Sequence, residues 1–380
     1  MVVQKNDFGD SMDMKKCENR EIGSFFEFPA FDCEKPEESI FYYLTHSAGR
    51  NNYSFVQYGR QAIKAVLQQI KGVREKNCYL PAYLCHSIVQ PFREMGLNIT
   101  YYSHEHPLIQ KIDENIRDSI VLILDYFGTE YFQTEKIKKF LEQGNSVIID
   151  TTHSILDERR RHLCHEGLYY IASLRKAFPI PDGAVIFHSH NNLEFGSICP
   201  KNYTPMLDAM IFKRFYLDET LKHSNMLNLD LKRRFLSLYT EYEESKDKED
   251  VHISKIPLIS LMILSNLRFN ILLERRRQNI TTIYENICNN KIFLFDIEEI
   301  RSPFMLPLIL QNNEKRECLK DLLLTNNIYP PIHWNIQGLI PKKFGYEHQL
   351  SSKILSIPID QRYSIEDMIG IANILNEVSV

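Results

Sequence analysis

The sequence predicts an α/β protein with a large domain built around a mixed, mostly parallel sheet and a smaller C-terminal α+β domain. Its 380 residues are enough for about two domains. From about residue 53 to 188, short apolar runs alternate with helical patterns, which is typical of a parallel sheet. After about residue 203 the chain becomes mainly helical, and the alternation returns near residue 304.

The expected strands of the large domain are short apolar runs. The clearest is Ser119 to Asp125, where Ile, Val and Leu are continuous, as in an internal parallel strand. The helix expected over 134–143 is followed by Gly144, and glycine commonly ends helices. The other strands are expected at 78–80, 98–102, 146–150, 168–172 and 184–188, and the other helices over 60–71 and 86–95.

The next part of the chain is expected to be mainly helical. Residues 203–245 have a helical pattern, and their charged tail EYEESKDKEDV is typical of an exposed loop or helix end. A single long helix is predicted from Ile256 to about Asn289, because Pro257 is tolerated in a first turn. Its basic cluster, Glu274 to Arg277, is expected on a solvated face.

Strands return at the C-terminus. Ser364 and Asp367 resemble a capping box at the start of the last helix. We expect strands near 304–310 and 354–357, and helices over 313–326 and 364–378. The predicted organisation is a flexible polar leader at 1–20, a large domain at 21–250 and a small domain at 251–380.

Composition favours a cytoplasmic protein that acts on a small molecule. The 45 basic and 49 acidic side chains leave a net charge of −4, so no general basic surface is available for nucleic acid. The apolar runs are far shorter than the roughly 20 residues of a membrane helix. The polar N-terminus lacks a signal-peptide pattern, and the eight cysteines stand singly, as in a reducing compartment. We therefore expect neither a nucleic-acid nor a membrane partner.

Several residues that can carry chemistry lie where a parallel sheet places its ligands, at the carboxyl ends of strands. Gly59 stands at a helix start, where free N–H groups attract phosphate, although a glycine there also suits a simple helix cap. Asp150 ends an expected strand and could be only a turn former. Lys176 follows Ser173 between two strands; it is either a surface lysine or one that forms a Schiff base with an aldehyde cofactor.

The order of these three features resembles the DegT/StrS-type aminotransferases, which are enzymes that use pyridoxal 5′-phosphate (PLP) and have the fold-type-I architecture of aspartate aminotransferase. The resemblance runs nearly end to end. It is closest to a divergent branch with Ser-x-Arg-Lys followed by Pro-Asp-Gly. The segments that carry it are Ile22 to Phe26, Tyr58 to Ala62, Leu80 to Tyr83, Val147 to His153, Tyr329 to His333 and Lys353 to Pro358.

The resemblance implies a role for each catalytic candidate. Lys176 would form the internal aldimine with PLP and then move protons between the substrate α-carbon and the cofactor. Asp150 would pair with the pyridine nitrogen and keep it protonated, which strengthens the ring as an electron sink. His153 would lie near the phenolic oxygen of the ring or near the substrate.

The resemblance also implies binding residues. Gly59, Arg60 and Ser173 would hold the phosphate, and His333 and Tyr83 would lie on the substrate side. The position of the ring-stacking aromatic falls on Cys85, with His86 beside it, and His86 is either a stacking residue or a helix-face histidine.

The chain also departs from the family pattern. Lys176 is the third residue after Ser173, whereas the family usually has its lysine at the fifth, and Gly183-Ala184 replaces Gly-Gly. The Asn-x-x-Arg segment, through which a neighbouring subunit reaches the phosphate, is not recognisable in 203–255.

The function that the resemblance implies is amino transfer from an amino acid to a keto-sugar nucleotide or a similar carbonyl compound. It would serve nucleotide-sugar metabolism or polysaccharide biosynthesis, in a homodimer. Two alternatives stay open: another PLP reaction such as elimination or decarboxylation, and a non-catalytic protein that binds PLP or a sugar nucleotide. No metal is expected, because no tetrahedral ligand spacing is found for His153, His162, Cys164 and His165.

Overall fold

The computed structural model describes residues 21–31, 36–46, 52–129, 134–157, 161–190, 193, 198–222, 228–248, 252–288 and 290–377. The leader expected at 1–20 lies outside these residues. Within them, no helix is long and apolar enough to cross a membrane.

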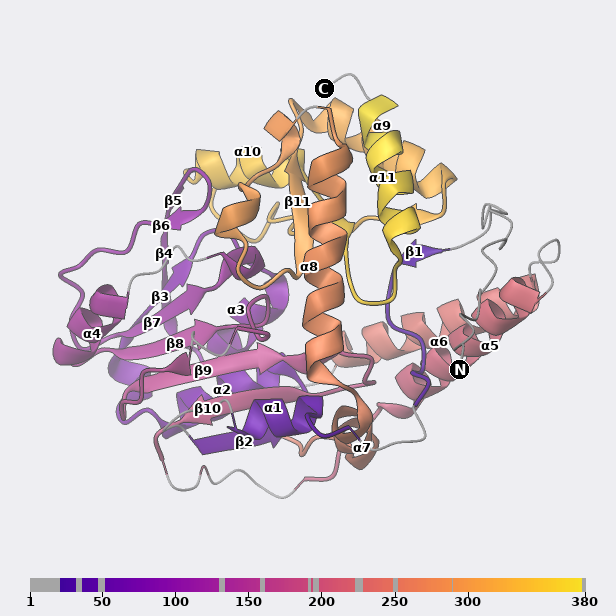
Figure 1. Ribbon diagram of the computed structural model, residues 1–380. Coiled ribbons are helices and arrows are strands. Elements are labelled where there is room, and N and C mark those ends of the chain that lie inside the picture. The colour runs from indigo at the N-terminus through magenta and orange to yellow at the C-terminus, as the bar shows by residue number, and fades with distance from the viewer. Residues whose placement is uncertain are drawn as a thin grey trace, which may run out of the picture.

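A seven-stranded sheet forms the larger part of the molecule, on the left of Figure 1. Its order is β2-β10-β9-β8-β7-β3-β4, in which the five strands from β9 to β4 run parallel and β10 is antiparallel to both neighbours. The predicted fold class is therefore confirmed. The strands are β2 (Asn52–Val56), β3 (Asn77–Pro81), β4 (Asn98–Tyr102), β7 (Ile120–Leu124), β8 (Ser146–Asp150), β9 (Leu168–Ser173) and β10 (Ala184–His188).

Two hydrophobic clusters cover the two faces of this sheet, because alternate strand residues point to opposite sides. Leu122 and Ile148 belong to one cluster, together with residues of α2 (Gly59–Gln69) and α3 (His86–Glu94). Val121 and Val147 belong to the other, with residues of α1 (Ile40–His46), α4 (Thr134–Glu142) and α7 (Leu258–Asn266). Burial on both faces explains why the central strands are continuously apolar.

The single helix predicted from Ile256 to Asn289 is wrong. The chain forms α7, breaks at Leu267 and Arg268 in extended conformation, and continues as α8 (Phe269–Asn286). The backbone at the start of α1 stabilises this break. The Ile40 N–H donates to the Leu267 carbonyl at 2.8 Å, and the Phe269 N–H donates to the Glu38 carbonyl at 3.2 Å. These partners lie far away in the sequence, so a local pattern does not reveal the break.

The remaining elements form a helical pair and a second layered unit. Helices α5 (Thr204–Lys222) and α6 (Leu229–Lys248) pack on each other at the right of Figure 1. Strands β11 (Met305–Ile309) and β13 (Ile354–Pro358) are antiparallel and lie with α8, α9 (Asn313–Thr325), α10 (Gly345–Lys353) and α11 (Ile365–Glu377). The capping box of the last helix is confirmed: the Ser364 N–H donates to Asp367 at 2.8 Å, and the Asp367 N–H donates to Ser364 at 3.3 Å.

Short strand pairs complete the architecture. Strand β1 (Ile22–Gly23) pairs in parallel with β12 (Ile328–Tyr329), which places the first described residues against the C-terminal unit. Strands β5 (His104–Glu105) and β6 (Ile109–Gln110) form a small antiparallel pair beyond β4.

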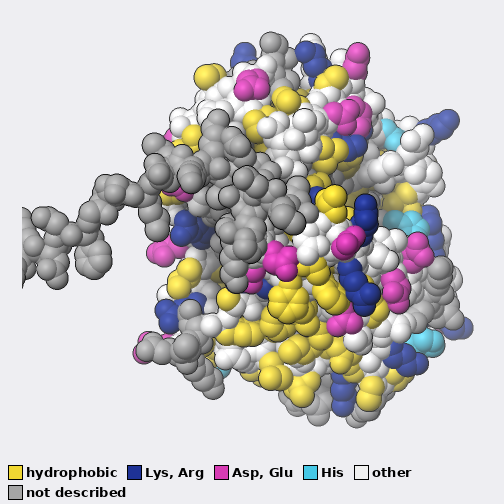
Figure 2. Space-filling model, turned by 90° about the vertical axis from the view of Figure 1, so that its right-hand side faces the viewer, with side chains coloured by type: hydrophobic (Ala, Val, Ile, Leu, Met, Phe, Trp, Pro, Cys, Tyr) yellow, Lys and Arg dark blue, Asp and Glu magenta, His cyan; other side chains and the backbone are white. Residues whose placement is uncertain are grey.

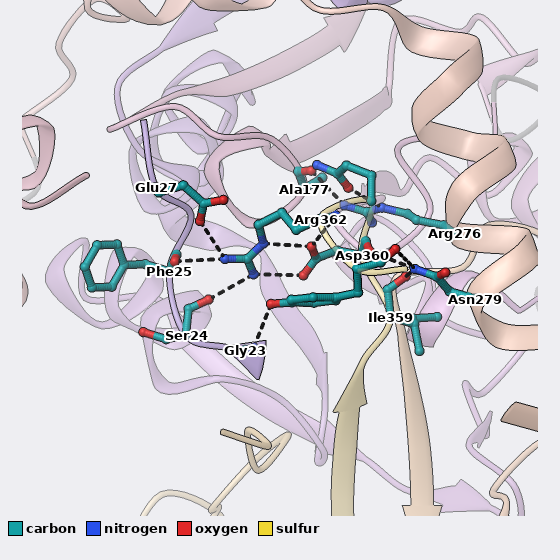
Figure 3. Close-up of polar contacts among 12 residues, drawn as sticks. Gly23, Ser24, Phe25, Glu27, Ala177, Arg276, Asn279, Ile359, Asp360 and Arg362 are labelled. Atoms are coloured by element: carbon teal, nitrogen blue, oxygen red, sulfur yellow. Dashed lines mark hydrogen bonds and ion pairs between the residues drawn. The ribbon is translucent and has the colours of Figure 1, made fainter. Parts of the chain in front are cut away.

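A buried polar network joins α8 to the large sheet unit and to the loop before α11 (Figure 3). Arg276 of α8 donates to the Ala177 carbonyl at 2.8 Å and to Gln361 at 2.9 Å. Only 1% of Arg276 is exposed, so the solvated face predicted for this basic cluster is wrong at this residue. The reason is helical spacing, because Arg276 shares a face with the buried residues Leu272 and Ile280.

We expect Gly128→Ala to destabilise the protein strongly. Gly128 has φ +76°, and an added Cβ would lie 2.0 Å from the Ser302 carbonyl oxygen, so backbone must move. The loss should exceed the ~1–2 kcal/mol that a left-handed residue alone costs. Gly96→Ala is the control, because Gly96 has φ +67° and no atom within 4 Å of the added Cβ. Denaturant unfolding measures both losses, and equal losses would contradict the steric argument.

Candidate active site

A cavity of about 60 Å³ lies at the carboxyl ends of β8 and β9, beside the N-terminus of α2. Five of the predicted site residues line it: Gly59, Arg60, Asp150, Ser173 and Lys176. They come from three separate segments, and the parallel pairing of β8 with β9 brings two of these segments together. Thr152, Arg175 and Lys246 also line the cavity.

Asp150 and Lys176 place a carboxyl group and an amine in the cavity. Asp150 is the last residue of β8, and its carboxylate accepts the Thr152 N–H at 2.9 Å. Burial raises the pKa of the Asp150 carboxyl above its usual value, while the Thr152 hydroxyl and the Lys176 ammonium act in the opposite direction. Lys176 ends a short 3₁₀ turn, Leu174–Lys176, directly after β9.

The start of α2 forms a cradle of hydrogen-bond donors. Tyr58, at the N-cap, makes no side-chain capping bond to the first turn of this helix. A Cβ added to Gly59 would lie 3.2 Å from the Ser173 Cβ and 3.7 Å from its hydroxyl, so the glycine leaves this approach open. Helix N–H groups, a serine hydroxyl and nearby cations are the donors that phosphate prefers.

His153, His333 and Tyr83 lie together in an aromatic cluster with Phe304 and Trp334. The ring of His153 stacks on Phe304 at 4.2 Å and on Trp334 at 5.6 Å, and it lies 5.7 Å from the ring of His333. The Trp334 N–H donates to the Tyr83 hydroxyl at 3.1 Å, and this hydroxyl donates to the His333 carbonyl. The substrate-side residues predicted from the sequence are therefore neighbours.

Both histidines of this cluster are neutral at pH 7. Burial is the main cause that lowers the pKa of His153 well below its usual value, and the nearness of the His333 ring and of Lys176 acts in the same direction. Burial and Lys176 lower the pKa of His333 to about 3. The Phe127 N–H donates to Nδ1 of His153 at 3.2 Å, so the neutral ring carries its proton on Nε2.

The structure does not bring Cys85 and His86 into the cavity. His86 is exposed at the first turn of α3, and Cys85 is half-buried with its Sγ 3.2 Å from the Ser87 hydroxyl. The helix instead turns Ser87 and Ile88 toward the cavity. Of the two interpretations of His86, the structure supports the helix-face histidine.

Sequence reasoning missed Lys246 and Trp334 as site residues. Lys246 lies in the charged tail that was expected to be exposed, yet its side chain is only 3% exposed and lines the cavity. Its burial depends on how α6 packs, which leaves no local pattern. The segment match to 329–333 pointed to the neighbourhood of Trp334 but stopped one residue before it.

The metal candidates do not form a site. Among the described residues, no group of three or more His, Cys, Asp or Glu side chains is placed to hold a metal ion.

Neither a protein-family model nor a curated protein matches the chain. Solved structures do. DesI, crystallised in the presence of its TDP-sugar product, is 12% identical, with 89% of this chain and 83% of that chain covered and a TM-score of 0.61. The PLP form of the putative sugar aminotransferase Spr1654 from Streptococcus pneumoniae is 10% identical, with 95% and 99% covered and a TM-score of 0.61.

A third structure, a DegT DnrJ EryC1 StrS aminotransferase from Brucella abortus, is 14% identical, with 89% of each chain covered and a TM-score of 0.57. The chain has the fold of these three proteins. In this aminotransferase fold, the cavity with Asp150 and Lys176 lies at the carboxyl edge of the parallel strands.

Trp334 should report the charge state of the two histidines, because it is the only tryptophan and a protonated imidazole quenches a neighbouring indole. Since both histidine pKa values are lowered, protonation should not begin near the usual value of about 6.5. We expect constant Trp334 fluorescence between pH 8 and about 5 in the folded protein. The denatured chain is the control, and a transition near pH 6.5 in the folded protein would contradict the assignment.

Proposed function

We propose that the chain is a cytoplasmic PLP-dependent aminotransferase that transfers an amino group from an amino acid to a keto-sugar nucleotide or a similar carbonyl compound. The observation that carries this proposal is the meeting of Lys176, Asp150 and the donor cradle of Gly59 and Ser173 in one cavity. The fold supports it, since the similar structures include proteins described as sugar aminotransferases. A nucleotide-linked sugar is favoured because DesI was crystallised with a TDP-sugar product.

The residues of the cavity fit PLP. The helix start at Gly59 and the hydroxyl of Ser173 would hold the phosphate, and Asp150 would pair with the pyridine nitrogen. The amine of Lys176 would hold the aldehyde carbon. When bound, PLP supplies an electron sink for the charge left when a proton leaves the substrate α-carbon.

Asp150, Lys176 and His153 then each have a task. The positive charge of Lys176 favours the ionised form of the Asp150 carboxyl. This carboxylate would hold a proton on the ring nitrogen of the cofactor. The Lys176 amine would take the proton from the α-carbon of the amino donor and pass it to the cofactor carbon, and it would move a proton in the reverse direction when the acceptor is bound. His153 carries its proton on Nε2, where it would donate a hydrogen bond to an oxygen of the cofactor or substrate.

The aromatic cluster excludes water from the substrate side. Tyr83 and His153 are buried, and Trp334 packs against both rings. Because His153 and His333 are neutral, they would form hydrogen bonds with polar substrate groups and would not attract a negatively charged group.

The central test is covalent labelling of Lys176. Adding PLP should give a yellow protein, borohydride should bleach the colour, and mass spectrometry of peptides should locate the phosphopyridoxyl group on Lys176. Lys176→Ala should lose the colour and all turnover, whereas Lys138→Ala, at an exposed position, should keep both. A colourless protein, or a label on another lysine, would overturn the proposal.

Glutamate distinguishes transamination from the alternatives. A transaminase bleaches the yellow form on mixing with glutamate and releases 2-oxoglutarate in a stoichiometric half-reaction. Release of carbon dioxide or of an eliminated group would instead indicate another PLP reaction, and binding without any half-reaction would indicate a non-catalytic protein.

We further propose that the protein is a homodimer. Hydrophobic side chains gather on the face shown in Figure 2, and α7 and the start of α8 expose Leu258 by 70%, Met262 by 55% and Ile271 by 52%. A contiguous apolar surface of this kind marks a protein interface, and a second copy is the commonest partner.

We expect the double substitution Leu258→Glu with Met262→Glu to give a monomer, because two charges would then be buried at the interface. Light scattering after size exclusion measures the mass. Leu324→Glu is the control, since Leu324 is 38% exposed on α9, at the opposite end of the molecule in Figure 1. A monomeric unsubstituted protein would contradict the proposal.

A further inference from the structure

Three cations from three different elements meet at the end of the cavity near α2. Arg60 comes from α2, Arg175 from the turn after β9, and Lys246 from α6. Arg60 donates to the Lys246 carbonyl at 3.1 Å and to Gln90 at 2.6 Å. The Lys246 side chain is 3% exposed, so its charge is held away from water.

One carboxylate, Glu243, faces these cations directly. Its Oε1 lies 2.7 Å from Nζ of Lys246 and 3.6 Å from Nη2 of Arg175. Although burial acts to raise the pKa of Glu243, Arg175 and Lys246 hold it below its usual value. A single negative charge leaves this end of the cavity with an excess of positive charge.

A second carboxyl, Asp182, lies behind the cations and compensates them only in part. It is fully buried, and it accepts hydrogen bonds from Gln57 at 3.1 Å and from Tyr242. Burial raises the pKa of Asp182 to about 7, so near neutral pH it carries only part of a charge. Burial and the Arg175 cation lower the pKa of Lys246 to about 7, and a bound dianion would favour its ammonium form.

Lys246 is held in position by its own helix. Tyr242 stands one turn earlier on α6, and Nζ of Lys246 lies 4.2 Å from the centre of its ring. The Tyr242 hydroxyl donates to Asp182 and lies 3.3 Å from the Pro181 carbonyl, in the loop that follows Lys176. The packing of α6 against this loop therefore presents Lys246 to the cavity.

We propose that Lys246 and Arg175 bind the phosphate of the phosphomonoester that occupies this cavity, so that α6 of the same chain supplies a phosphate ligand. This inference rests on the proposed function, in which that phosphomonoester is PLP. It accounts for the missing Asn-x-x-Arg segment, because Lys246 and Arg175 bring the positive charge from within the chain. The helix start at Gly59 and Ser173 completes the donor set.

The experiment compares Lys246→Met with Arg233→Met, which removes one positive charge from an exposed position of the same helix. Each variant is titrated with PLP and with pyridoxal, which lacks the phosphate. We expect Lys246→Met to bind PLP about 10- to 100-fold more weakly, the usual effect of losing a hydrogen bond to a charged group. Its affinity for pyridoxal should be unchanged, and Arg233→Met should bind both as the unsubstituted protein does.

Inorganic phosphate gives a readout that does not depend on the cofactor. Phosphate should raise the melting temperature of the unsubstituted protein and of Arg233→Met by binding the folded state, and it should not raise that of Lys246→Met. Lys246→Arg keeps the charge and should restore both phosphate stabilisation and PLP affinity; it also serves if Lys246→Met folds poorly.

The outcomes separate the two proposals. If Lys246→Met binds PLP as tightly as the unsubstituted protein, the phosphate role of Lys246 is overturned while the aminotransferase proposal stands. If neither PLP nor pyridoxal binds the unsubstituted protein, yet phosphate stabilises it through Lys246, the phosphate site stands and the proposed cofactor falls.

Discussion

The parallel pairing of β8 with β9 is the constraint on which the site depends. It sets Asp150 opposite Ile171, and the Thr151 N–H donates to the Ile171 carbonyl at 2.8 Å. Because parallel strands end on the same edge, the last residue of β8 and the turn after β9 must meet there. Backbone hydrogen bonds alone therefore bring the Asp150 carboxyl and the Lys176 amine to the same edge of the sheet.

The turn that carries Lys176 is then fixed from the other side by α8. Arg276 donates to the carbonyl of Ala177, the next residue, and the neighbouring Asn279 donates to the Asp360 carbonyl at 2.9 Å (Figure 3). Arg362 pairs with Asp360 and reaches the Phe25 carbonyl at 3.1 Å. A buried guanidinium without acceptors is costly, so this network holds the C-terminal unit in one arrangement relative to the Lys176 turn.

Sequence reasoning found the parts of this site that are local. Asp150 ends one apolar strand and Lys176 ends the short turn after the next, so a strand pattern locates both within ten or so residues. Their roles came from the resemblance to a family. Arg276, Lys246 and the break at Leu267 depend on partners distant in the chain, and their burial follows from packing that no local pattern records. Cys85 and His86 do not line the cavity, although the sequence placed them there. The reason is related: one step along a helix turns a side chain by about 100°, and Ser87 is the residue directed to the cavity.

The two ends of the site differ in charge, and this difference orients a ligand. Cations collect at the α2 end of the cavity, around Arg175 and Lys246. The aromatic cluster with its two neutral histidines is not part of the cavity lining, but both histidines lie near enough to Lys176 for its charge to lower their pKa values. In a partly buried site, the cations attract a dianionic group. Against the aromatic rings the same group would lose hydration with no positive charge to compensate for the loss. A ligand that carries a phosphate would therefore have one favourable orientation, with its phosphate held by the cations and the rest of the molecule directed toward the aromatic cluster. The low pKa values of the histidines, which follow from their burial, are thus part of the means by which the site distinguishes its two ends.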